Sequence, residues 1–455
     1  MNEAPGRLLI RGGDVITMDP ALGDLPGADV LIEGGRISTV GEALPEGGAE
    51  VIDARGRIVM PGLIDAHLHT WESAVRGLGG DWMGPEYFRV IHAGAGPRYT
   101  PEDIHLGTLA GALAHLDRGT TGLFDWCHGN ATSEHTDAAI DALFESGIRA
   151  LFGHGTVKPD PKPGQPHYSE IPHPAGEIRR LRSGRLGDDT ARVTLAMAIL
   201  GSEQATWEVT LHDFKLAKEH GLLTSAHIWG RPEAKVPDGY RRLNDLNLLG
   251  PDHNLVHGYD LDDEEVRLIL DAGVSITATP VPELQRNTAT PLMLRVRDMG
   301  GRPSIGCDHE VYNSADMFDA MRHALRSSRI FDNVRSAAAG KGPVEDPVTM
   351  REALEWATIN NARAMGLDGR IGSLSPGKEA DIILLRRDGL GVWPVADLIH
   401  AAVMFAGPRD VEAVLVGGQF VKRDFKLLFG GNRLASLHER LALSRKRLLE
   451  GTGYA

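Results

Sequence analysis

The chain is poor in cysteine and in aromatic residues, and it lacks a long hydrophobic run. Its two cysteines, Cys127 and Cys307, are too few for a disulfide framework and fit a reduced protein. No apolar run approaches the length of a membrane span. The first residues do not show the charged region and apolar core of a signal peptide. These absences predict a cytoplasmic protein without a membrane segment.

The acidic balance of the chain restricts its partners. The formal net charge is −14 over 455 residues, which argues against nucleic acid or an anionic membrane as the main partner. Hydrophobic residues make up 42% of the chain and charged residues 24%, as in ordinary globular proteins. The length suffices for one large domain and one smaller domain. We expect a small molecule as the partner.

At both ends of the chain, short runs of residues that favour strands alternate with glycines that favour turns. We therefore predict one small β-sandwich domain that is built from residues 1–60 and 371–430. The strands expected in it are 8–11, 14–17, 28–33, 36–40, 51–53, 380–385 and 411–416.

The middle of the chain, residues 61–370, alternates strands with amphipathic helical stretches. Eight strand–helix units predict an α/β fold, a TIM-like (β/α)8 barrel, with the active site at the carboxyl ends of its strands. Residues 431–455 predict a C-terminal helix that packs either on the β-domain or on a second subunit, in a homodimer or higher homo-oligomer. The eight expected barrel strands are 62–67, 120–125, 149–153, 193–200, 222–227, 254–257, 275–279 and 304–308.

Residues that can bind a metal follow four of these strands. His67 and His69 end the first strand, and side chains two residues apart on a strand point to the same face. His227 ends the fifth strand, His257 the sixth and Asp308 the eighth. Since the carboxyl ends of barrel strands converge, these residues predict a mononuclear site with a metal-bound water as nucleophile.

Short motifs recur in a fixed order along nearly the whole chain, at residues 61–69, 76–77, 119–122, 225–227, 257–258, 306–308, 316–322, 358–363 and 372–382. This ordered set resembles the amidohydrolase superfamily. Within it, the set is most similar to the group of chlorotriazine hydrolases and of cytosine, guanine and S-adenosylhomocysteine deaminases.

The resemblance implies a role for each residue of the constellation. It implies metal ligands at His67, His69, His227 and Asp308, and one divalent ion, for which zinc is the expectation and iron and manganese are the alternatives. It also implies that Asp308 takes the proton of the attacking water. His257 would orient or polarise the water or the substrate.

Two positions depart from the family pattern. The segment at the end of the fourth strand, residues 198–203, lacks the lysine that bridges two metals in many relatives. We therefore expect one metal and a solvated Glu203, with a bridging Glu203 as the alternative. Gly230 stands where deaminases of the group carry a glutamate that protonates the substrate. Asp260 and His309 are candidates for that task, although Asp260 can instead cap the helix that begins at Leu261.

Four tryptophans follow predicted strand ends and predict an aromatic substrate pocket. They are Trp71, Trp82, Trp126 and Trp229. The proline-rich segment 156–176 is either a lid over this pocket or a surface insertion.

The sequence thus predicts a metal-dependent hydrolase that acts on a C–N or similar bond of a small heterocyclic or amide-like substrate, as a deaminase or amidohydrolase. A non-hydrolytic lyase or decarboxylase on the same barrel is the alternative, because the usual glutamate is missing at Gly230. A non-catalytic binding or assembly protein is the third hypothesis, and the complete ligand set argues against it.

Overall fold

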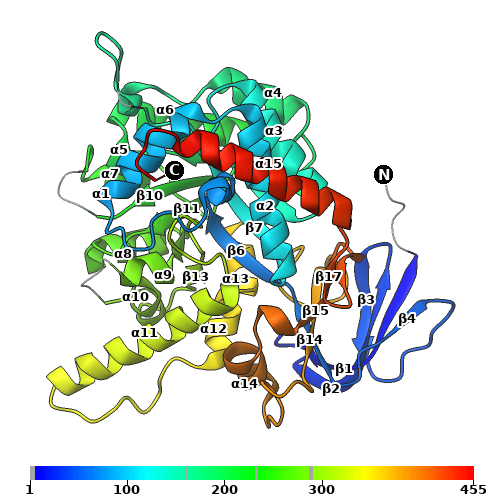
Figure 1. Ribbon diagram of the computed structural model, residues 1–455. Coiled ribbons are helices and arrows are strands. Elements are labelled where there is room, and N and C mark those ends of the chain that lie inside the picture. Colours follow the sequence, from blue (N-terminus) through cyan, green and yellow to red (C-terminus); the bar gives the residue numbers. More distant parts are fainter. Residues whose placement is uncertain (1–5, 160, 231–233, 286–289, 455) are drawn as a thin grey trace.

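Eight parallel strands form a barrel at the centre of the molecule (Figure 1). The computed structural model describes residues 6–159, 161–230, 234–285 and 290–454. Adjacent barrel strands are also adjacent in the chain, which confirms the predicted α/β barrel. The strands are β6 (Leu63–Leu68), β7 (Thr120–Cys127), β8 (Arg149–His154), β9 (Val193–Ile199), β10 (Thr224–Ile228), β11 (His253–His257), β12 (Ser275–Ala278) and β13 (Ser304–Ile305).

The seam between the first and the last strand closes at the metal-ligating residues. β13 has only two residues, but the backbone continues to a bridge between Leu68 and Asp308. Asp308 N donates to His67 O at 2.9 Å, and His69 N donates to Asp308 O at 2.6 Å. Asp65 Oδ1 braces the same seam, because it accepts hydrogen bonds from the backbone N of His67 and of Cys307, each at 3.1 Å. Closure of the barrel therefore brings the first and last ligands together.

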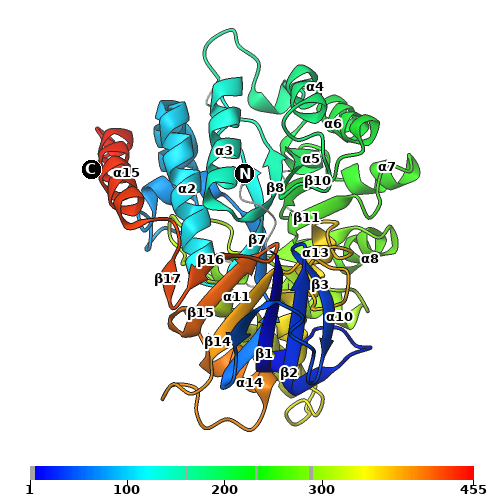
Figure 2. The same cartoon turned by 90° about the vertical axis from the view of Figure 1, so that its right-hand side faces the viewer.

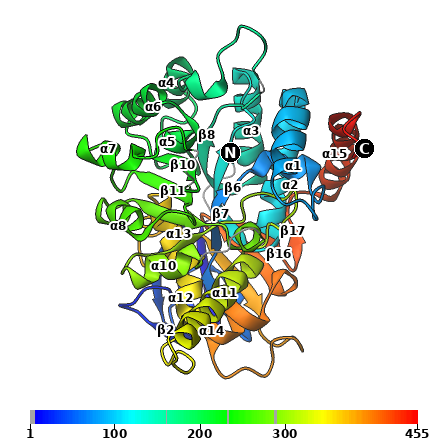
Figure 3. The same cartoon turned by 90° about the vertical axis from the view of Figure 1, so that its left-hand side faces the viewer.

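Helices surround the barrel (Figure 3). Several begin with a capping box: Thr100 and Asp103 form one on α2, and Asp262 and Glu265 form one on α8. The prediction that Asp260 caps α8 is wrong, because the cap lies two residues later. The longer helices are α2 (Pro101–Asp117), α3 (Ser133–Ser146), α4 (Ala175–Ser183), α6 (Trp207–His220), α7 (Gly239–Asp245), α8 (Asp263–Asp271), α10 (Leu292–Asp298), α11 (Met317–Ala338), α12 (Met350–Trp356) and α13 (Ile359–Ala364).

Short helical segments link these elements. Several of them lie in the loops that follow barrel strands, where they position side chains at the mouth of the barrel. They are η1 (Thr70–Val75), α1 (Pro85–Tyr87), η2 (Phe88–Ala95), η3 (Gly96–Arg98), η4 (Tyr168–Glu170), α5 (Gly201–Gln204), α9 (Pro280–Leu284), α14 (Leu398–His400), η5 (Ala401–Phe405) and η6 (Pro408–Asp410).

Strands from both ends of the chain form a second sheet beside the barrel (Figure 2). Its order is β17-β16-β15-β14-β5-β1-β2-β3, with β4 paired to β1, and the antiparallel pair of β14 and β5 joins the two ends. The sheet encloses an apolar core of its own. The strands are β1 (Arg7–Ile16), β2 (Asp24–Glu33), β3 (Arg36–Gly41), β4 (Glu50–Asp53), β5 (Arg57–Pro61), β14 (Ile382–Arg386), β15 (Val411–Val416), β16 (Gln419–Arg423) and β17 (Lys426–Leu427).

One detail of this sheet differs from the prediction. Residues 8–11 and 14–17 were expected to be two strands, but β1 runs through both, with an irregular register around Gly13. A Cβ atom at Gly13 would lie 2.5 Å from a methyl carbon of Val59. The glycine therefore permits close packing within the sheet and does not mark a turn.

The C-terminal helix α15 (Gly431–Leu449) packs on the barrel helix α2. Ser444 Oγ donates to Asp103 Oδ1 at 2.6 Å, and Arg445 Nη1 donates to Arg76 O at 2.7 Å. Within the chain, α15 thus packs on the barrel and not on the β-domain, which was one of the two alternatives considered from the sequence. None of the helices in the described part of the chain combines the length and apolar character needed to cross a membrane.

Candidate metal centre and active site

Four buried side chains converge at the carboxyl end of the barrel. His67 lies on β6, His69 directly follows it, His227 lies on β10, and Asp308 follows β13. One ligand atom from each lies within 4.8 Å of the others. Asp308 Oδ1 is 3.3 Å from His67 Nε2 and 3.5 Å from His69 Nε2. The structure thus brings together all four ligands that the sequence predicts.

The protonation pattern of the four residues fits a cation. His69 Nδ1 lies 2.7 Å from the carbonyl oxygen of Trp126, so it carries the proton and Nε2 is left with a lone pair. That lone pair faces the carboxylate of Asp308. An ionised carboxylate can only accept hydrogen bonds, so the two groups cannot bond to each other. His67 Nε2 and His227 Nε2 lie 3.2 Å apart, and the Nδ1 atoms of both are buried without a partner among the described residues. Converging acceptors of this kind suit a divalent metal ion.

The electrostatics of the centre also favour metal binding. Burial lowers the pKa of the His67, His69 and His227 side chains, so the imidazoles are neutral at physiological pH. Burial alone would raise the pKa of Asp308, but His309 and His67 hold that pKa well below its usual value. Neutral imidazoles and an ionised carboxylate are the forms that ligate.

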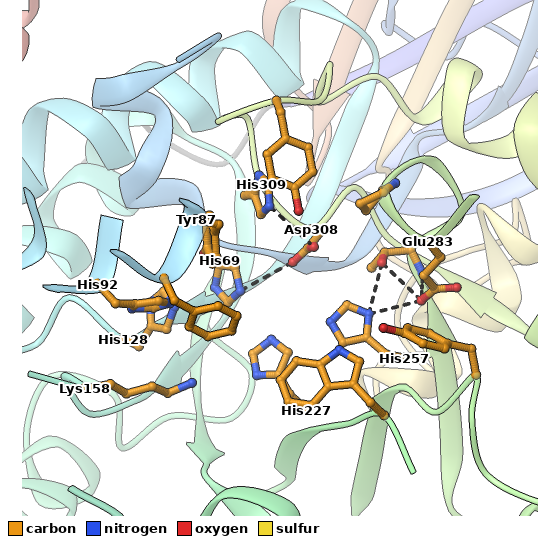
Figure 4. Close-up of a pocket in the computed structure, with 16 residues that line it drawn as sticks. His69, Tyr87, His92, His128, Lys158, His227, His257, Glu283, Asp308 and His309 are labelled. Carbon is orange, nitrogen blue, oxygen red and sulfur yellow. Dashed lines mark hydrogen bonds and ion pairs between the residues drawn. The ribbon is translucent and has the colours of Figure 1, made fainter. Parts of the chain in front are cut away.

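His257 lies beside the metal-ligating residues and is oriented by Glu283. The ring centroids of His257 and His227 are 5.4 Å apart. His257 Nδ1 lies 3.1 Å from Glu283 Oε1 and 3.1 Å from Thr279 Oγ1. The backbone N of Thr279 donates to the same Glu283 oxygen at 2.8 Å. This arrangement leaves His257 Nε2 for the pocket (Figure 4).

His257 and Asp308 share an unusual backbone conformation. Their φ angles are 75° and 68°, which side chains other than glycine rarely adopt. Strain of this kind is typical of functional sites. Glu283, in contrast, gave no signal in the sequence, because it lies on the short helix α9 and not at a strand end.

A pocket of roughly 600 Å³, partly open to solvent, lies next to the four ligands (Figure 4). Among the predicted substrate-binding residues, Trp229 and His309 line it, whereas Trp71, Trp82, Trp126 and Asp260 do not. The lining residues are His69, Tyr87, Phe88, His92, His128, Lys158, His227, Trp229, His257, Tyr259, Thr279, Pro282, Glu283, Asp308, His309 and Tyr312.

The three tryptophans outside the pocket have packing roles behind it. Trp71 Nε1 donates to His128 Nδ1 at 3.0 Å, and Trp126 supplies the carbonyl oxygen that orients His69. Trp82 packs edge-on against Tyr454. Asp260 is exposed to solvent. The pocket walls come largely from tyrosines and histidines of the loops after β6, β7 and β13, whose positions no strand periodicity reveals.

The backbone of the segment after β10 depends on two residues, Glu203, which binds it, and Gly230, which lies within it. Glu203 was expected to be solvated, but it is buried, and its Oε2 accepts hydrogen bonds from the backbone N of Trp229 at 2.7 Å and of Gly230 at 3.0 Å. Within the described residues it is not part of the metal-ligating group. A Cβ atom at Gly230 would lie 2.4 Å from the backbone N of Leu261. The backbone thus leaves no room here for the family's glutamate.

Replacement of Gly230 by alanine is expected to destabilise the protein by about 2 kcal/mol or more, because strain at positive φ and a steric clash add together. Urea unfolding measures the effect. The matched control is Gly221→Ala: Gly221 also has a positive φ, of 62°, but a Cβ atom there meets nothing within 4 Å. Equal losses in the two variants would contradict the steric argument.

Comparison with known proteins identifies relatives over nearly the whole chain. The model of the amidohydrolase family matches residues 58–421. The chain is 26% identical over 431 residues to a 5'-deoxyadenosine deaminase of Methanosarcina mazei, covering 92% of this chain and 94% of the relative. It is 27% identical over 435 residues to a 5-methylthioadenosine/S-adenosylhomocysteine deaminase of Symbiobacterium thermophilum, with the same coverage.

Solved structures agree with the fold. The zinc complex of atrazine chlorohydrolase from Arthrobacter aurescens TC1 superposes with a TM-score of 0.82 at 23% identity, covering 96% of this chain and 100% of the other. An adenosine deaminase from Xanthomonas campestris with bound zinc gives a TM-score of 0.81 at 22% identity, covering 98% and 99% of the two chains.

Proposed function

We propose that this chain, which belongs to the amidohydrolase family and is a metal-dependent hydrolase, uses water to displace a substituent from a ring carbon of a small nitrogen heterocycle. The leaving group is ammonia, an amine or another displaceable substituent such as chloride. The observation that carries the proposal is the convergence of His67, His69, His227 and Asp308 beside a pocket into which His257 also projects.

The walls of the pocket support a planar substrate. Trp229 is nearly parallel to His257, at 5.7 Å between ring centroids, and Tyr87 is stacked on His309 at 4.7 Å. Flat aromatic walls with a few polar anchors suit a heteroaromatic ring. The substrates in the names of the relatives, 5'-deoxyadenosine, 5-methylthioadenosine and S-adenosylhomocysteine and atrazine, agree with this class.

The roles of the residues follow from their positions. A divalent ion held by His67, His69, His227 and Asp308 would lower the pKa of a bound water molecule and stabilise negative charge. Asp308 accepts the proton of the water whose oxygen forms the new bond to the ring carbon, and it passes that proton to the leaving group as the old bond breaks. His257, held by Glu283, directs its Nε2 to the substrate and stabilises the charge that develops on the ring.

The proposal is tested by measuring the turnover of several candidate substrates in ¹⁸O-labelled water. The metal-loaded protein is incubated with 5'-deoxyadenosine, 5-methylthioadenosine, S-adenosylhomocysteine, adenosine and atrazine. Release of ammonia, amine or chloride is measured together with the mass of the product. We expect one ¹⁸O atom in the product for each leaving group released. Product without ¹⁸O would identify a lyase, and the absence of metal-dependent turnover on every ring would reject the substrate class.

We further propose zinc as the resident ion, a cytoplasmic location and a homo-oligomeric assembly. Three imidazoles and one carboxylate are a ligand set that zinc accepts, and two structural relatives contain zinc. Elemental analysis of the protein as purified tests the ion, and light scattering after size-exclusion chromatography tests the assembly. Iron or manganese in place of zinc, or a monomeric mass, would contradict the respective proposal.

A further inference from the structure

Lys158 is a cationic side chain in the pocket that the proposed mechanism does not use. It lies in the loop that follows β8, and only 9% of the residue is exposed. Its side chain extends into the pocket toward His227, well apart from Asp308 (Figure 4). The Nζ atom is 5.5 Å from the ring centroid of Trp126, a contact that positions an ammonium group without neutralising its charge.

Within the described part of the chain, no carboxylate neutralises Lys158. Its Nζ atom carries three N–H donors, but it forms no hydrogen bond and no salt bridge with any of these residues. Glu72 is the acid that interacts with it electrostatically. Glu72 Oε1 already accepts a hydrogen bond from the Tyr87 hydroxyl at 2.7 Å, and burial raises the pKa of Glu72 well above its usual value. Glu72 is therefore a poor counter-ion.

The other titratable groups that face Lys158 are histidines. They are His92 on η2, His128 after β7 and His227 on β10, and burial lowers the pKa of all three, so they add no charge. Burial lowers the pKa of Lys158 to about 8, which leaves the amine mostly protonated at neutral pH. The pocket thus contains a buried positive charge whose counter-ion the described chain does not supply.

A buried charge without a partner destabilises a folded protein, and such groups are retained where a ligand completes them. We propose that Lys158 binds an anionic group of the substrate, a carboxylate or an ionised ring oxygen, so that the substrate class is an anionic nitrogen heterocycle. The proposal rests on the proposed function for the ring and its reaction. It assigns Lys158 to recognition and not to proton transfer, because Asp308 already carries the proton from water to leaving group.

A binding experiment tests this proposal without any turnover. Isothermal titration calorimetry compares pyrimidine-5-carboxylate, whose carboxylate is too far from the ring nitrogens to chelate a metal, with the neutral pyrimidine-5-carboxamide on the metal-loaded protein. Lys158→Met removes the charge and shortens the side chain by only one atom, and Lys158→Gln repeats the loss of charge with a polar group. Lys162→Met is the matched control, since Lys162 belongs to the same loop but is exposed and does not line the pocket.

We expect the wild-type protein and Lys162→Met to bind the carboxylate at least about tenfold more tightly than the carboxamide, as one charge-assisted contact allows. Lys158→Met and Lys158→Gln are expected to bind both compounds within twofold of each other. Lys158→Met should also raise the Tm of the ligand-free protein by about 2 °C or more, because an unpaired buried charge is removed.

Two results would overturn the proposal. One is a carboxylate preference that survives in the Lys158 variants, which would locate anion binding at the metal. The other is equal affinity of the wild-type protein for both compounds. Neither result depends on the panel of the turnover assay, so failure of the proposed reaction and failure of Lys158 as an anion-binding residue are told apart.

Discussion

Replacement of Asp308 by asparagine is expected to lower kcat by about 10³-fold, within the range of roughly 10²–10⁴ that general acid–base groups contribute. Asparagine retains a side-chain oxygen that can still face the metal, but an amide cannot take the proton of water. The metal content should therefore fall much less than the activity. The measurement pairs steady-state kinetics on a substrate from the panel with elemental analysis of the same sample.

The control for this prediction is Asp213→Asn. Asp213 is another buried carboxyl group, and its Oδ1 accepts a hydrogen bond from the backbone N of His173 on the outer layer of the barrel, away from the pocket. This variant should retain wild-type kcat, which separates the loss of the proton acceptor from the general effect of altering a buried acid. Wild-type turnover by Asp308→Asn would remove Asp308 from its proposed role.

Replacement of His227 by alanine is expected to weaken metal binding by more than 100-fold, and activity should be lost with the metal. Changes behind the ligands already lower metal affinity by about 10–100-fold, and His227 contributes a ligand atom itself. Competition with a chelator of known affinity measures the change. Addition of excess metal should restore part of the activity only at concentrations far above those that saturate the wild type.

The matched variant is His253→Ala. His253 is also a fully buried histidine of the barrel, but it stands at the start of β11 and bonds to Thr224 and Tyr240. Its loss should lower thermal stability, because a buried side chain and its hydrogen bonds to two hydroxyl groups are removed, while the metal affinity stays within twofold of the wild type. If His227→Ala bound metal as tightly as His253→Ala, the four-ligand centre would be wrong.

The metal centre could be predicted from the sequence because, in a barrel, the position of a residue along its strand indicates where it lies in space. A polar residue at the carboxyl end of any barrel strand faces the same mouth, so His67, His227 and Asp308 could be brought together without coordinates. The strand periodicity placed each of them at such an end. The same reasoning cannot place residues of the loops, since a loop has no period to follow.

The tryptophans show where that reasoning stops. Trp71, Trp126 and Trp229 were all predicted to follow strand ends, but Trp126 is the penultimate residue of β7, and of the three only Trp229 lines the pocket. Which side of a loop faces the ligand depends on how the loop packs on its neighbours. Trp71 is directed to His128 by its indole N–H. Trp126 orients His69 through its backbone carbonyl, and its ring contacts Lys158 and His227 from outside the pocket.

The shape of the site around Gly230, on the side of the substrate, depends on contacts between segments that are distant in the sequence. The sequence shows that Gly230 lacks a carboxylate, but only the structure shows that the backbone of Leu261 leaves no space for one. The fit of Glu203 under the same segment is likewise a contact between two different barrel loops. Neither contact follows from periodicity or composition.

The sequence by itself determined the barrel and the joining of both chain ends in one sheet, because both follow from the period of apolar residues and from strand order. It also predicted the four metal ligands, through the polar residues at strand ends together with the resemblance to the amidohydrolase superfamily. Only the tertiary structure decided which side chains reach the substrate. Glu283 behind His257 and the buried position of Lys158 in the pocket become visible only when loops from different strands pack together, since burial and hydrogen bonding are properties of neighbours in space.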